Sequence, residues 1–107
     1  MIYELRIYDT LPGRLPNLHK RFAEHTLSLF EKHGLKSIGY WEEAVGQNNR
    51  LVYLLAFENL QQREEAWQAF RSDPEWQAAQ AESEKDGQIV SLVTNRILRP
   101  TAYSPMK

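Results

Sequence analysis

Three polar side chains that could bind or polarise a ligand recur at every second position near the start of the chain: Glu4, Arg6 and Tyr8. Residues 1–9 alternate as a strand does, so these three are expected on one face of it. In a cavity, Arg6 would hold an anionic or carbonyl group and Tyr8 would donate a hydrogen bond. The alternative is a buried ion pair across a dimer interface, which would fix the register of the two copies.

Aromatic residues on later strands form a second candidate group. Trp41, Tyr53 and Phe57 are expected to point toward one space. They would line an aromatic pocket for a flat apolar ligand. The alternative is that they pack between two sheets.

Asn95 and Arg96 are adjacent in the last predicted strand, so their side chains face opposite ways and only one can reach a cavity. We predict that Arg96 is the one that meets a ligand acid; alternatively it pairs with Glu4 or with a partner's carboxylate. The predicted ligand-binding residues are therefore Arg6, Tyr8, Trp41, Tyr53 and Arg96. No catalytic residue can be named.

The sequence predicts no metal site and no cofactor, although haem remains an alternative. His19, His25 and His33 are six and eight residues apart, whereas a helical metal pair needs a spacing of about three or four. The chain has no cysteine, which excludes disulfides, thiolate nucleophiles and Cys-ligated metals.

Periodicity predicts the order β-α-β-β-α-β. The expected strands are residues 1–9, 35–46, 50–58 and 88–98; the expected helices are 15–33 and a segment from Leu60 that restarts at Asp73-Pro74. Arg63 is expected on the surface of the latter helix. Right-handed crossovers place both helices on one face of a four-stranded antiparallel sheet, the ferredoxin-like member of the α+β class, in one domain spanning 1–107.

The strand at 50–58 is apolar on both sides. Two helices cover only one face of the sheet, and the other face would expose a large apolar patch in a monomer. A second copy that meets it sheet to sheet is the simplest cover, so the expected partner is another copy of this chain.

Charge and hydropathy exclude several other partners. Lys and Arg number 13 and Asp and Glu 14, for a net charge of −1, so we expect no nucleic-acid binding. No apolar run approaches the ~20 residues of a membrane span, and no signal peptide is recognised. The expected location is cytoplasmic.

Several motifs along the chain resemble the NIPSNAP family. They are Tyr3-Glu4-Leu5-Arg6-Ile7-Tyr8, Pro12-Gly13, His33-Gly34, Gly39-Tyr40-Trp41, Asp73-Pro74-Glu75-Trp76 and Asn95-Arg96-Ile97-Leu98-Arg99-Pro100. The resemblance implies the dimeric α/β barrel fold, shared with antibiotic-biosynthesis and haem-degrading monooxygenases. It implies no settled activity.

We therefore expect a homodimer that binds a small molecule in a semi-polar cavity between sheet and helices. The first alternative is a monooxygenase or isomerase that acts on an aromatic or haem-like substrate. The second is a non-catalytic interaction module. Whether the protein is an enzyme stays open at this point, because no group titrating near neutral pH can be placed in the cavity.

Overall fold

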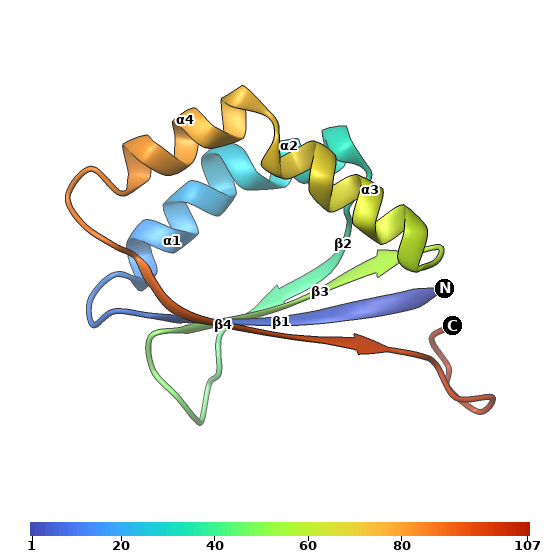
Figure 1. The fold of residues 1–107 in the computed structure, drawn as a ribbon. Coiled ribbons are helices and arrows are strands. Elements are labelled where there is room, and N and C mark those ends of the chain that lie inside the picture. The colour runs from blue at the N-terminus through green and yellow to red at the C-terminus, as the bar shows by residue number, and fades with distance from the viewer.

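The computed structural model describes residues 1–107 as a sheet with helices on one face (Figure 1). The elements are β1 (Ile2–Thr10), α1 (Leu15–Arg21), the π-helix η1 (Phe22–Thr26), α2 (Leu27–His33), β2 (Lys36–Trp41), β3 (Arg50–Phe57), α3 (Leu60–Arg71), α4 (Pro74–Ser83) and β4 (Val90–Leu98). The strand order is β2-β3-β1-β4, and every neighbouring pair is antiparallel. This confirms the ferredoxin-like α+β prediction, with β1 and β3 at the centre.

The ends of the helices follow the capping residues in the sequence. The Asn59 side chain accepts a hydrogen bond from the backbone N–H of Gln62 at 2.8 Å and begins α3. Asp73 accepts from the N–H of Glu75 at 2.8 Å and begins α4. Gly34 has φ 81° and ends α2, because glycine adopts this left-handed conformation without a Cβ penalty.

The helix predicted at 15–33 contains an irregular turn. At η1 the N–H of Leu27 donates to the carbonyl of Phe22, and the Thr26 hydroxyl donates to the carbonyl of Arg21 at 3.3 Å. A π-turn adds one residue to the helical turn, so the side chains before and after it are rotated relative to those of a regular α-helix. Single π-turns inside α-helices are frequent at functional sites.

The predicted strand at 35–46 is too long, since β2 ends at Trp41. The side chain of Glu43 accepts from the N–H of Gln47 at 2.8 Å and pairs with Arg50 at 3.2 Å, which closes a loop before β3. A carboxylate that bonds its own backbone competes with strand pairing. The last strand also begins later than predicted, at Val90.

The helix-facing side of β3 forms the centre of the core. Leu51, Tyr53, Leu55 and Phe57 are at most 3% exposed. The ring of Phe30 on α2 lies 6.2 Å from that of Tyr53. This part of the space between helices and sheet is filled by side chains.

The opposite face of the sheet has no helix over it (Figure 1). Its side chains are mostly apolar and come from all four strands: Tyr3, Leu5, Ile7, Trp41, Val52, Leu54, Ala56, Leu92 and Leu98. Leu92 is 58% and Trp41 52% exposed, whereas the paired residues Tyr3 and Ala56 are buried, at 7% and 2%. We call this set the uncovered face. No helix in the structure is long and apolar enough to cross a membrane.

Candidate functional site

The carboxylate of Glu4 is completely buried on the helix-facing side of β1. It accepts five hydrogen bonds. The donors are Arg6 Nη1 at 2.9 Å, Arg63 Nε at 2.9 Å and Nη2 at 3.0 Å, Trp67 Nε1 at 2.8 Å and Asn95 Nδ2 at 3.0 Å. A buried charge is tolerated when its lone pairs are filled in this way.

These contacts decide the ionisation of Glu4. Burial by itself would raise its pKa, but the hydrogen bonds from Arg63, Asn95 and Trp67 and the charge of Arg6 outweigh burial. The pKa of Glu4 falls from 4.5 to about 2. The carboxylate therefore stays charged in the folded protein at neutral pH.

Arg6 links this carboxylate to two tyrosines. Its Nε donates to the Tyr53 hydroxyl at 2.9 Å and its Nη2 to the Tyr8 hydroxyl at 3.2 Å, while Tyr53 donates to Tyr8 at 2.8 Å. Burial opposes the charge of Arg6, but the two tyrosines and Glu4 raise its pKa. Burial raises the pKa of Tyr53 well above its ordinary value, so its hydroxyl remains a donor.

The ion pair of Glu4 and Arg6 lies within one chain and packs against α3, where the guanidinium of Arg6 is 4.4 Å from the centre of the Trp67 ring. The alternative of an ion pair across a dimer interface is therefore wrong. The reason is that even-numbered residues of β1 face the chain's own helices, whereas the uncovered face carries the odd-numbered ones.

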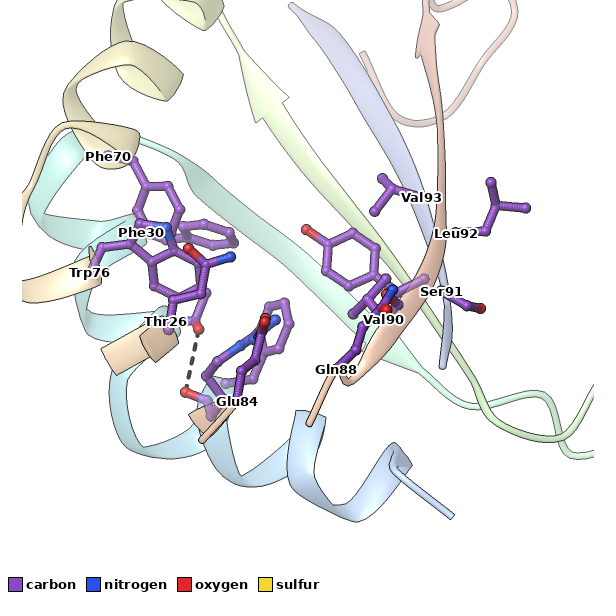
Figure 2. A pocket seen from close by; sticks show the side chains of 14 residues that line it. Thr26, Phe30, Phe70, Trp76, Glu84, Gln88, Val90, Ser91, Leu92 and Val93 are labelled. Carbon is purple, nitrogen blue, oxygen red and sulfur yellow. Dashed lines mark hydrogen bonds and ion pairs between the residues drawn. The ribbon is translucent and has the colours of Figure 1, made fainter. Parts of the chain in front are cut away.

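Tyr8 lines a cavity of about 490 Å³ between the helices and the strands β1 and β4. Figure 2 shows Phe30, Phe70 and Trp76 on one side of it and Val90 and Val93 on the other. The cavity is semi-polar, because Gln80, Glu84 and Gln88 line it together with these apolar side chains. Concave sites of a few hundred Å³ are typical of small-molecule binding. The residues Phe22 and Thr26 of η1 also line it.

Arg21 brings a second guanidinium to this cavity. Its side chain is only 5% exposed, and Nη1 donates to Ser83 Oγ at 3.3 Å and to Glu84 Oε1 at 3.2 Å. The guanidinium also lies 5.3 Å from the centre of the Trp76 ring. Its Nε has no hydrogen-bond partner in the chain, a rare state for a buried donor.

Of the five predicted ligand-binding residues only Tyr8 lines this cavity, and two of the others lie on the opposite face of the sheet. Arg96 pairs with Leu5, so its side chain is on the uncovered face, and Asn95 is the neighbour that reaches Glu4. Trp41 pairs with Val52 on that same face. A Cβ on Gly39 would lie 2.6 Å from the indole of Trp41, so the glycine leaves room for the ring.

The remaining three, Arg6, Tyr8 and Tyr53, lie together on the helix-facing side. Phe57 shares that side with Tyr53, not with Trp41. Tyr53 and Phe57 therefore lie on one side of the sheet and Trp41 on the other, so the three do not form one pocket.

Sequence reasoning missed two residues that bind Glu4, Arg63 and Trp67. Arg63 was expected on the surface, but only 17% of its side chain is exposed and it holds both carboxylate oxygens. Trp67 follows Arg63 by four residues, so both lie on one helix face. The four-residue spacing predicts that Arg63 and Trp67 share a helix face, but it does not predict that this face contacts Glu4.

The three histidines do not converge. His33 Nε2 lies 2.7 Å from Asp73 Oδ2, and hydrogen bonds from His33 and Lys32 lower the pKa of the Asp73 carboxyl. His19 lies 3.4 Å from Glu42. No cluster of three or more metal-ligating side chains occurs in the structure.

A buried polar network and a semi-polar cavity, under helices on one face of an antiparallel sheet, define a ferredoxin-like α+β protein with a candidate internal site. The family model of NIPSNAP matches residues 3–105. The chain belongs to the NIPSNAP family.

Solved structures agree with this assignment. A NIPSNAP family protein of unknown function from Agrobacterium tumefaciens is similar at 26% identity and TM-score 0.88, with 100% of this chain and 94% of that chain covered. A NIPSNAP-like domain protein from Burkholderia xenovorans has 27% identity and TM-score 0.85, with 97% and 88% covered.

A more distant likeness, which concerns the fold alone, is to a mutant of MhuD with two manganese protoporphyrin IX molecules bound per active site. It has 18% identity and TM-score 0.60, with 97% and 98% covered. Among proteins with curated descriptions, none matches the sequence.

Proposed function

We propose that this protein is a homodimer that binds a small molecule in the cavity between the helices and β4. The observation that carries the proposal is the cavity itself, about 490 Å³ and lined by Tyr8, where the helix layer leaves β4 uncovered. Val93 and Ile97 on the helix-facing side of β4 are 44% and 40% exposed, in contrast to the filled space over β3.

The dimer part of the proposal rests on the uncovered face. Leu5, Ile7, Val52 and Leu54 form the middle of an apolar surface across the two central strands. Burial of apolar surface contributes about 25 cal/mol per Å². A second copy that meets this surface sheet to sheet would cover all of it by symmetry.

The residues of the cavity do not fit an axially ligated haem. None of the three histidines lines it, nor does either methionine, and these are common axial ligands of haem iron. Tyr8 is the one lining residue of a type that ligates haem, and its oxygen already accepts two hydrogen bonds. A small organic ligand fits the cavity better.

Native mass spectrometry of freshly purified protein tests both parts of the proposal. We expect twice the chain mass, with a retained small molecule that is released on denaturation. Val93→Trp would place an indole inside the cavity and should abolish retention without changing the dimer. Ile97→Trp is the matched control, since Ile97 lies on the same face of β4 but does not line the cavity. A monomer would refute the dimer, and equal retention by the two variants would refute the site.

A further inference from the structure

The hydroxyl of Tyr8 has a proton that no group of the chain accepts. A tyrosine hydroxyl can donate one hydrogen bond and accept two. The Tyr8 oxygen accepts from Arg6 Nη2 at 3.2 Å and from the Tyr53 hydroxyl at 2.8 Å. Tyr53 is fully buried and its oxygen accepts from Arg6 Nε, so Tyr8 is the acceptor for its proton. The proton of Tyr8 is left over, at a residue that lines the cavity.

The network behind Tyr8 carries an excess of positive charge. Arg6 and Arg63 share the single carboxylate of Glu4. The other partner of Arg63 is Glu64, whose side chain is 64% exposed and therefore screened by water. Around the cavity itself, Arg21 is balanced by Glu84. A negative charge next to the Tyr8 hydroxyl would thus be stabilised by the guanidinium of Arg6 through the intervening tyrosine.

The aromatic side of the cavity constrains the shape of the ligand. Phe70 and Trp76 have ring centres 4.6 Å apart, and Phe30 lies 4.9 Å from Phe70. Aromatic side chains arranged in this way bind a flat apolar body by edge and face contacts.

We propose that the ligand class of this cavity is a small planar oxyanion, a phenolate or an enolate. Its charged oxygen accepts the hydrogen bond of Tyr8, and its planar carbon framework contacts Phe30, Phe70 and Trp76. Arg6 is a positioning residue, because it holds the hydroxyls of Tyr8 and Tyr53 as donors without touching the ligand. This inference rests on the proposed function of the cavity.

The test compares para-nitrophenolate with the neutral para-nitroanisole, in which a methyl group caps the same oxygen and removes its charge, by calorimetric titration at a pH where the phenol is ionised. The wild-type protein should prefer the phenolate. A hydrogen bond to a charged group is worth about 1.5–3 kcal/mol, so Tyr8→Phe should weaken phenolate binding roughly tenfold to hundredfold and leave the ether unaffected.

Tyr40→Phe is the matched control. This substitution also removes one phenolic hydroxyl from a ring that stacks on Tyr53, with ring centres 5.1 Å apart. The Tyr40 hydroxyl, however, forms a hydrogen bond with Ser37, and Tyr40 does not line the cavity. Its phenolate affinity should match that of the wild type. The melting temperature of each variant confirms that it is folded.

The outcomes separate the two proposals. If both probes bind equally, or if Tyr8→Phe weakens them equally, the oxyanion preference is refuted while the cavity remains a binding site. If neither probe binds up to its solubility limit, and the purified protein retains no small molecule, both proposals are refuted.

Discussion

Glu4 and Leu5 are neighbours in the sequence and lie on opposite faces of the same strand. Glu4 finds five hydrogen-bond donors inside its own chain. Leu5 lies between Leu54 and Arg96 on the face that carries no helix. The carboxylate of Glu4 is thus fully satisfied within one chain, whereas the apolar side chains of the uncovered face are not covered by it. A few directed hydrogen bonds satisfy a polar network, whereas an apolar surface is removed from water only by another surface of similar area.

The largest expected effects come from placing one charge on either side of β3. Leu55 is fully buried under the helices and Leu54 is half-buried on the uncovered face. Leu55→Asp should prevent folding, because a buried unpaired carboxylate costs several kcal/mol out of a total stability of about 5–15 kcal/mol. Leu54→Asp should give a folded monomer.

Circular dichroism and sedimentation velocity check this pair of variants. A folded Leu55→Asp protein would contradict the placement of the core. A Leu54→Asp protein that remains a dimer would show that the uncovered face is not the interface.

The next effect concerns the polar network alone. Glu4→Gln keeps the shape of the side chain but leaves the partly buried Arg6 and Arg63 without their shared anion. Breaking a buried ion pair in this way costs about 3–5 kcal/mol. Urea denaturation at neutral pH measures the loss, and the dimer mass should be unchanged.

The same carboxylate predicts a dependence of stability on pH. Because the pKa of Glu4 is 4.5 in an exposed reference state and about 2 when folded, its contribution is fully present above about pH 4.5. It is lost as the pH falls toward 2 and amounts to about 3 kcal/mol. Urea titrations across this range should show the loss in the wild type, and Glu4→Gln should lack that component. Parallel pH curves for the two proteins would show that Glu4 does not hold the charge assigned to it.

The smallest effect distinguishes the two adjacent residues of β4. Asn95→Ala removes one of the five bonds to Glu4 and should lower the free energy of unfolding by about 1 kcal/mol. Arg96→Ala should change it by less than about 0.5 kcal/mol, because the Arg96 side chain is exposed on the uncovered face and forms no ion pair or hydrogen bond within the chain. Denaturation of the two variants under one condition tests the order. A larger loss for Arg96→Ala would reverse the assignment of the two faces of β4.

Much of the fold was predictable from local signals. The alternation of residues 1–9 correctly placed Glu4, Arg6 and Tyr8 together, and the caps at Asn59 and Asp73 marked two helix starts. The π-turn at Phe22–Thr26 was not predictable, since its residues also fit a regular α-helix. The early end of β2 depends on a bond between Glu43 and Gln47 that the periodicity does not show.

The sequence by itself determined which residues share a face of each strand, because the two-residue period of a strand is a local property. It also determined that the two central strands carry more apolar surface than two helices can cover. Only the tertiary structure decided that Arg63 and Trp67 meet Glu4, that Asn95 and not Arg96 joins them, and that β4 is left open beside Tyr8. Those facts depend on strand register and on how the helices lie across the sheet, which are set by packing between distant segments and not by local spacing.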